Sequence, residues 1–261
     1  MVAGCGDAGM GPARVTYDGL APGDLAARIR APSCLILPRV TSTLDVVHEL
    51  AAEGAPDGTV VLADEQVVGR GRGGRRWHSP RGAGILLGYL HRPAQEPIAG
   101  VLALRVGLAV GQALGALGLE PRLKWPNDVV MGDKKVGGVL CEARTAPGGA
   151  TWVGLGIGLN VHGPLAPEVA SRAATLDHMD PKVTRLAVLE ELVPRLHQLG
   201  GGLVLTPAEQ AAYRRYDWLA GRDVVGPVAG RVVGVDVDGA LLVESARGRE
   251  RVLAGTVAVA M

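Results

Sequence analysis

Hydrophobic and polar residues follow two periods along the chain, one typical of strands and one typical of helices. Short apolar runs bounded by glycine, proline or aspartate predict strands at Leu35–Pro38, Thr59–Gln66, Gly84–Leu90, Arg122–Lys124, Val129–Met131, Lys135–Arg144 and Thr151–Val161. Apolar residues three or four apart predict helices at Leu44–Glu53, from Pro97 to about Leu117, at Pro181–Leu199 and at Pro207–Trp218, with a short helix near Asp24–Ile29. These elements predict one large domain over residues 31–218.

The pattern changes at Gly221 to short alternating strands joined by turns. They are predicted at Asp223–Val228, Gly230–Val237, Ala240–Ser245, Arg249–Leu253 and Thr256–Ala260. Asp238-Gly239 is a strong hairpin signal, because glycine adopts the positive φ that tight hairpins need. Residues 219–261 therefore predict a small β-barrel-like domain. The Gly- and Ala-rich residues 1–30 lack a clear pattern and predict an N-terminal tail.

The composition fits a folded protein with a sizeable apolar core. The chain has 261 residues, of which 48% are hydrophobic and 20% are charged. Its net charge of +1 is too small to produce an overall electrostatic attraction to nucleic acid or to a membrane. Three separated cysteines without a CxxC pair disfavour a disulfide framework or zinc site and fit a reducing cytoplasm. Arg105 and Gln112 interrupt the apolar stretch Val101–Leu119, which favours a buried helix over a membrane span.

The densest polar feature is the loop Gly69–Pro80, which carries four arginines, four glycines and one tryptophan but no acidic residue. Glycine loses the most backbone entropy on ordering, so we expect no helix or strand within this run. Its N–H groups and guanidinium groups suit carboxylates and phosphates. We expect a mobile loop that orders over an anionic, nucleotide-like ligand. The loop contains a GxGxxG motif, but a predicted strand follows it, whereas a helix follows this motif in a dinucleotide-binding site. The loop also resembles an RGG nucleic-acid-binding segment, but such segments usually repeat and this one occurs once. Both alternatives are therefore disfavoured.

Two sets of regularly spaced glycines predict close approach of the backbone to a neighbour. Gly107, Gly111 and Gly115 share one face of the predicted long helix, which we expect to pack closely on a sheet. The second set alternates along the strand Thr151–Val161 at Gly154, Gly156 and Gly158. Alternate residues of a strand face the same side, so this backbone can admit either a ligand or a tightly packed segment of the chain.

Lys124-Trp125-Pro126-Asn127-Asp128 is a second polar cluster, following a short strand. Lysine, asparagine and aspartate within five residues can supply a cation, an amide and a carboxylate suited to magnesium. A polar turn is an equally good interpretation of this segment alone. Lys135 lies among apolar residues of a predicted strand. It is catalytic if its face points into the site, and otherwise a solvated edge residue.

Four motifs in order resemble the signature set of biotin protein ligases. They are the arginine loop to Trp77, Lys124–Asp128, Lys135-Val136-Gly137-Gly138 eleven residues after Lys124, and Gly156-Ile157-Gly158-Leu159-Asn160. The match runs from about Leu35 to the C-terminus. The resemblance implies an α+β fold, in which helices back a mixed, mainly antiparallel sheet like that of class II aminoacyl-tRNA synthetases. It also implies an SH3-like barrel at the C-terminus.

The resemblance implies a ligase with a two-step reaction. Biotin and MgATP give biotinyl-5′-AMP and pyrophosphate, and the biotinyl group then passes to a lysine of a biotin carboxyl carrier protein of acetyl-CoA carboxylase or a related enzyme. No protein nucleophile is needed, because the biotin carboxylate attacks the α-phosphorus. Catalysis then depends on positioning and charge stabilisation.

The resemblance also implies roles for single residues. Lys135, Arg70 and Arg72 are the expected catalytic cations. Biotin would be bound by Ser42, Thr43, Gln66, Arg70, Gly71, Arg72, Lys135, Gly138 and Gly156. ATP and the adenylate would be bound by Arg72, Arg75, Trp77, Lys124, Asn127, Lys135 and Asn160, and Mg²⁺ by Asp128. Ser42 or Thr43 is also a predicted helix N-cap.

The chain departs from the family pattern at two positions. Leu44 stands where asparagine is frequent, and His78 stands where an aromatic residue is frequent. A lipoate ligase and a non-catalytic biotin-binding relative are the competing hypotheses. About 30 residues precede the first predicted strand, fewer than a winged helix-turn-helix needs, so we expect a monofunctional ligase without specific DNA binding. The oligomeric state stays open, including a homodimer through a sheet edge.

Overall fold

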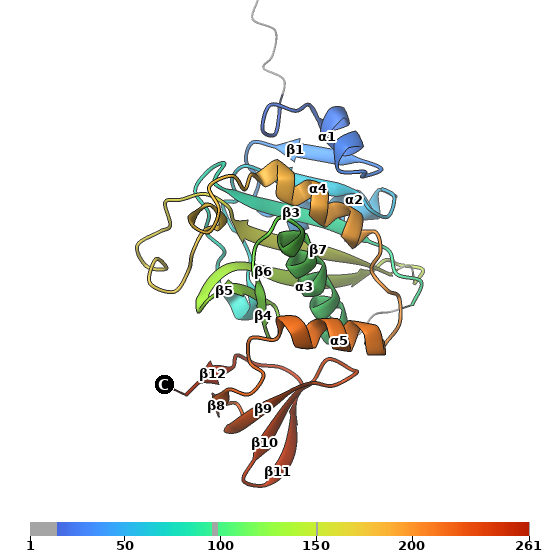
Figure 1. Cartoon of the computed structure of the whole chain (residues 1–261). Coiled ribbons are helices and arrows are strands. Elements are labelled where there is room, and N and C mark those ends of the chain that lie inside the picture. The colour runs from blue at the N-terminus through green and yellow to red at the C-terminus, as the bar shows by residue number, and fades with distance from the viewer. Residues whose placement is uncertain (1–14, 96–98, 150, 261) are drawn as a thin grey trace, which may run out of the picture.

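A seven-stranded sheet forms the centre of the larger part of the molecule (Figure 1). The computed structural model describes residues 15–95, 99–149 and 151–260. In sheet order the strands are β1 (Cys34–Leu37), β2 (Val60–Ala63), β3 (Gly84–His91), β7 (Thr151–Asn160), β6 (Lys134–Thr145), β5 (Asp128–Met131) and β4 (Arg122–Lys124). Only β1 and β2 pair in parallel. The predicted mixed, mainly antiparallel α+β fold is confirmed.

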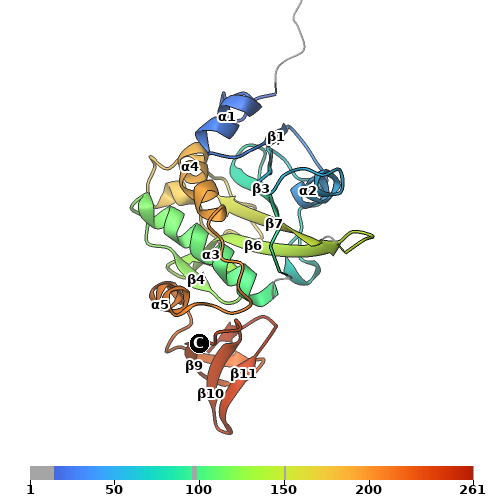
Figure 2. The same cartoon turned by 90° about the vertical axis from the view of Figure 1, so that its right-hand side faces the viewer.

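Helices cover both faces of this sheet (Figure 2). On one face lies α2 (Thr43–Ala52), against β2, β3 and β7. On the other face lie α3 (Ala99–Ala116), which contacts β4, β5 and β6, and α4 (Arg185–Leu196), which packs against α3. The main core lies between the sheet and these two helices. Predicted helix Pro181–Leu199 begins later, at Arg185, because the Thr184 side chain accepts a hydrogen bond from the Ala187 N–H.

The alternation of residues along β3 and β7 separates the two faces. Leu87, Leu155 and Ile157 enter the core under α3 and α4. The intervening glycines face α2, where a Cβ at Gly88 would lie 2.7 Å from Val47 and one at Gly156 would lie 2.9 Å from Leu44. Gly156 therefore packs tightly on α2, which does not exclude a ligand contact at the same residue.

The glycine face of α3 does not pack as predicted. A Cβ at Gly111 would meet the Tyr216 ring at 3.3 Å, and one at Gly115 would meet the Tyr216 hydroxyl at 3.4 Å. Tyr216 belongs to α5 (Pro207–Tyr216), so most of the glycine face accommodates a helix rather than the sheet. Only Gly107 faces a strand residue, Leu123 of β4. Pro97, the predicted start of the helix, lies outside the described residues.

The segment before β1 contributes to the core. It contains α1 (Pro22–Arg28), and Tyr17, Leu25 and Ile29 are fully buried. The guanidinium group of Arg185 lies over the Tyr17 ring and pairs with Asp18. These contacts fix residues 15–30 against the larger sheet, whereas the rest of the expected N-terminal tail lies outside the described residues.

A second sheet lies at the C-terminal end of the chain and is antiparallel throughout (Figure 1). Its strands, in sheet order, are β11 (Gly248–Val252), β10 (Leu241–Ser245), β9 (Gly230–Val235), β8 (Asp223–Gly226) and β12 (Ala258–Val259). The Trp125 indole donates to the carbonyl of Gly239, at 2.9 Å, in the predicted turn between β9 and β10. This contact ties the Lys124–Asp128 turn to the small sheet. Within the described ranges, no helix has the length and apolar character needed to cross a membrane.

Candidate active site

A cleft of about 490 Å³ opens on the sheet face that carries α2. Its walls come from the start of α2, the arginine loop, the Lys124–Asp128 turn, and strands β6 and β7. Eleven of the predicted site residues line it: Ser42, Thr43, Gln66, Arg70, Gly71, Arg72, Trp77, Asn127, Lys135, Gly138 and Gly156. Residues from motifs more than 100 positions apart therefore meet in one cleft.

Uncharged polar groups form part of the cleft lining. Gln66 follows β2, and its Oε1 accepts hydrogen bonds from the Thr43 backbone N–H at 2.8 Å and from the Thr43 hydroxyl at 3.1 Å. Ser42 occupies the predicted N-cap position of α2 but makes no side-chain capping bond. The prediction that Ser42 or Thr43 is the N-cap is therefore confirmed for the position of Ser42, but the side-chain acceptor at this helix start is Gln66. The buried Ser42 side chain instead lines the cleft.

The arginine loop folds into a short hairpin beside these groups. The Gly71 N–H donates to the Arg75 carbonyl at 2.7 Å, and the Trp77 N–H donates to the Gly69 carbonyl at 2.9 Å. One 3-10 turn, Arg72–Gly74, forms its tip, where Gly73 and Gly74 adopt positive φ. The loop thus contains one more ordered turn than its composition predicts. Glycine supplies the two left-handed residues that close it.

The side chains of Arg72 and Arg75 point from this tip to the small sheet. Arg72 Nη1 donates to the carbonyl of Gly255 at 3.1 Å, and Arg75 Nη2 donates to the Thr256 hydroxyl at 2.5 Å. Both acceptors are uncharged, so the contacts do not neutralise either guanidinium group. The segment between β11 and β12 therefore contacts the arginine loop beside the cleft, which the sequence did not predict.

Trp77 and Lys135 lie together over the bare backbone of two strands. The Lys135 ammonium group lies 5.5 Å from the centre of the Trp77 ring and 2.5 Å from Asp128 Oδ1. A Cβ on Gly158 would lie 2.5 Å from the Trp77 ring, and one on Gly138 would lie 3.2 Å from Lys135 Nζ. Gly158 therefore admits the tryptophan, in contrast to Gly156, which faces α2.

Four predicted site residues lie beside the cleft rather than in its lining: Arg75, Lys124, Asp128 and Asn160. Lys124 Nζ lies 5.0 Å from the centre of the Trp218 ring. Burial lowers the pKa of Lys124, the Asp128 carboxylate opposes this effect, and the positive charges of Lys135 and Arg222 add to it. The side-chain amide of Asn160 donates to the Ala174 carbonyl at 3.2 Å, in the long loop that follows β7.

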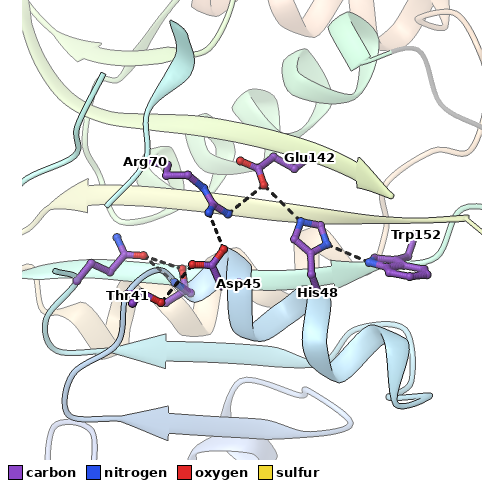
Figure 3. Close-up of polar contacts among 8 residues, drawn as sticks. Thr41, Asp45, His48, Arg70, Glu142 and Trp152 are labelled. Atoms are coloured by element: carbon purple, nitrogen blue, oxygen red, sulfur yellow. Dashed lines mark hydrogen bonds and ion pairs between the residues drawn. The ribbon is translucent and has the colours of Figure 1, made fainter. Parts of the chain in front are cut away.

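Arg70 is paired with two carboxylates (Figure 3). Its Nη1 donates to Asp45 at 2.5 Å, and its Nη2 donates to Glu142 at 3.0 Å. The predicted catalytic role of Arg70 stays a prediction, because two carboxylates already compensate its charge, as Asp128 does for Lys135. Sequence reasoning missed both partners. Asp45 looks like an ordinary first-turn acid of α2, and the one signal for Glu142 is a charge inside an apolar strand.

Asp128 is the one predicted metal ligand. Within residues 15–95, 99–149 and 151–260, no three histidine, cysteine, aspartate or glutamate side chains cluster as a metal site. Mg²⁺ commonly takes one or two carboxylates and completes its shell with water and substrate phosphates. Asp128 supplies one such carboxylate, and Lys135 Nζ lies 2.5 Å from it. A magnesium ion held here would therefore need the phosphates of a bound nucleotide as further ligands.

Comparison with known proteins identifies two family matches. Residues 36–161 match the biotin/lipoate A/B protein ligase family, and residues 225–259 match the biotin protein ligase C-terminal domain. The biotin–[acetyl-CoA-carboxylase] ligase of Paracoccus denitrificans is 32% identical over 244 residues, which cover 85% of this chain and 98% of that protein. The bifunctional ligase/repressor BirA of Bacillus spizizenii is 31% identical over 232 residues, covering 84% and 71%.

Solved structures of biotin protein ligases have a similar fold. The biotin protein ligase from Aquifex aeolicus, in complex with biotin and ATP, superposes with a TM-score of 0.75 at 28% identity, covering 88% of this chain and 99% of that chain. The match therefore covers most of this chain and nearly all of that one. The sequence matches, their coverage and the shared fold together show that this chain belongs to the biotin protein ligase family of enzymes.

Proposed function

We propose that this chain joins biotin to ATP as biotinyl-5′-AMP and transfers the biotinyl group to a lysine of a biotin carboxyl carrier protein. The observation that carries the proposal is that one cleft is lined both by the uncharged polar side chains of Ser42, Thr43 and Gln66 and by the cations of Arg72 and Lys135. A ligand with a polar uncharged ring and a carboxylate, next to a nucleotide, complements both kinds of group. The complex of the Aquifex aeolicus ligase with biotin and ATP supports the same two substrates.

The chemistry needs positioned charges and no nucleophilic side chain. A carboxylate oxygen of biotin attacks the α-phosphorus, the bond to the bridging oxygen of the β-phosphate breaks, and pyrophosphate leaves with that electron pair. Lys135 and Arg72 stabilise the negative charge in the transition state and cannot accept the acyl group while protonated. In the second step the neutral lysine amine of the carrier attacks the acyl carbon, and AMP leaves.

We assign the remaining site residues by their position in the cleft lining or beside it. Ser42, Thr43, Gln66, Gly138 and Gly156 contact biotin, and Gly71 offers backbone to the phosphate. Trp77 and Asn127 contact adenine or ribose, as Asn160 does if its amide turns from Ala174. Arg75 and Lys124 attract the leaving pyrophosphate, and Asp128 holds the magnesium ion of MgATP.

Pyrophosphate release by the purified protein with MgATP tests the proposal. We expect release with biotin and none with lipoate, followed by labelling of a biotin carboxyl carrier domain. Release with lipoate alone would indicate a lipoate ligase instead. Tight biotin binding without release would indicate a non-catalytic relative and would direct attention to Leu44 and His78.

Absence of specific DNA binding, a cytoplasmic location and a homodimer through a sheet edge stay predictions. A gel-shift titration with promoter DNA tests the first, and a shift that persists at high salt would contradict it, because nonspecific phosphate contacts weaken steeply with salt.

A further inference from the structure

Two carboxylates from different elements bind the guanidinium group of Arg70. Asp45 comes from the first turn of α2, and Glu142 comes from β6. Arg70 follows Gly69 at the base of the loop hairpin, and Arg70 also forms a bridge with Arg76 across it. The two ion pairs therefore connect the base of a glycine-rich loop to both walls of the cleft.

Each carboxylate is itself held in place. Thr41 donates to Asp45 Oδ2 at 3.2 Å, which leaves Oδ1 for Arg70. His48 Nε2 lies 3.4 Å from the Glu142 oxygen that accepts from Arg70, and the Trp152 indole N–H donates to His48 Nδ1 at 3.0 Å (Figure 3). Indole N–H is a donor only. His48 Nδ1 must therefore accept, so the imidazole is neutral and carries its proton on Nε2, facing Glu142.

The surroundings of His48 favour its neutral form with the proton on Nε2. Its side chain is fully buried, and burial lowers its pKa. Gly154 gives it space, since a Cβ there would lie 3.1 Å from the imidazole. Protonation would also turn Nδ1 into a second donor facing the Trp152 N–H. The ring therefore serves as a neutral donor to Glu142.

We propose that Asp45, His48 and Glu142 are positioning residues that hold Arg70, and through it the loop Gly69–Trp77, over the cleft. A loop rich in glycine loses much conformational entropy when it orders. Ion pairs that already hold the loop in the free protein reduce the conformational entropy that is lost when the ligand binds. Their loss should weaken substrate binding and leave the chemical step unchanged, because none of the three residues supplies charge to the reacting atoms.

The test compares three histidine variants. His48→Leu removes the N–H that orients Glu142 and keeps an apolar side chain in the core. His48→Gln keeps a donor near the position of Nε2. His91→Leu is the matched control, because His91 is also buried beside a carboxylate, Asp57 at 3.7 Å, but it belongs to neither the loop contacts nor the cleft lining.

The first readout is the rate of tryptic cleavage within Arg70–Arg76 without any substrate. In His48→Leu we expect cleavage to accelerate about threefold to tenfold, which corresponds to about 0.7 to 1.4 kcal/mol. His48→Gln should cleave close to the parent rate, and His91→Leu should not differ from the parent. If His48→Leu does not fold, Glu142→Gln replaces it, since this change removes the charge and keeps the shape.

The second readout is kinetic and rests on the proposed function. In pyrophosphate release, His48→Leu should raise KM for biotin about threefold to tenfold, with kcat within about twofold of the parent. Unchanged cleavage in His48→Leu or its replacement, equal acceleration in His91→Leu, or no rescue by His48→Gln would each overturn the proposal. A parent protein that releases no pyrophosphate would overturn the ligase function and leave the cleavage result valid.

Discussion

Gly158→Ala should weaken nucleotide binding and leave the stability of the fold nearly unchanged. A Cβ at this position would lie 2.5 Å from the Trp77 ring, whereas ordinary contact begins at 3.4 Å, so the ring has to retreat by about 0.9 Å. The backbone of Gly158 lies outside the left-handed region, and alanine therefore adds no backbone strain there. Trp77 belongs to a surface loop, so the overlap is relieved by moving the loop hairpin and not by distorting the sheet.

The cost of such overpacking is typically about 1 to 3 kcal/mol. Because the proposed nucleotide site needs Trp77 in place, we expect KM for ATP to rise about fivefold to 150-fold, the equivalent of that energy. The assay is pyrophosphate release at saturating biotin, together with thermal unfolding, in which Gly158→Ala should melt within a few degrees of the parent.

Gly88→Ala is the matched control on the same sheet face. Its Cβ would lie 2.7 Å from Val47 and 2.9 Å from the Thr43 carbonyl, inside the packing of α2. This variant should melt at a lower temperature and keep the parental KM for ATP in its folded fraction. If Gly158→Ala instead loses stability and binds ATP like the parent, Trp77 is a packing residue and our assignment to the nucleotide is wrong.

Three further predictions address the chemistry, the loop and a buried acid. Lys135→Ala should abolish pyrophosphate release while the melting temperature stays near the parent value, since Lys135 is partly exposed; unchanged release would remove it from the mechanism. Biotin plus ATP should slow tryptic cleavage within Arg70–Arg76, and equal rates with and without substrates would contradict loop closure. Burial raises the pKa of Asp217 to about 6, so the folded chain favours the protonated acid. As pH falls from about 6 to about 4, the parent should gain up to about 3 kcal/mol of unfolding free energy relative to Asp217→Asn; a pH-independent difference in denaturant titrations would refute this.

Local patterns were sufficient for the elements and for the motifs that meet in the cleft. The predicted strand Gly84–Leu90 and the observed β3 differ by only one residue. The agreement is close because the glycine before the apolar run marks where the strand begins. Lys135 and Trp77 reach the same cleft because the Lys135 motif begins β6 and Trp77 lies in the arginine loop, and both border the cleft.

These local patterns did not predict which side chains from distant segments contact each other. His48 and Glu142 are 94 residues apart, and neither shows in its own segment that the other will face it. The glycine face of α3 illustrates the same limit. Spacing predicts that a face of small residues packs closely, but the neighbour, Tyr216 of α5, follows only from how the helices assemble.

The pairing of Arg70 changes which charges can attract an anion to the cleft. Arg70 is compensated by Asp45 and Glu142, and Lys135 is paired with Asp128 before any substrate binds. Arg72 and Arg75 contact only uncharged acceptors on the small sheet and form no ion pair within the described part of the chain. Arg76, at the base of the loop hairpin, also forms no ion pair among the described residues, so the uncompensated positive charge of the loop comes from Arg72, Arg75 and Arg76. Since Arg72 and Arg75 contact the segment between β11 and β12, the small sheet helps to hold two of these three charges.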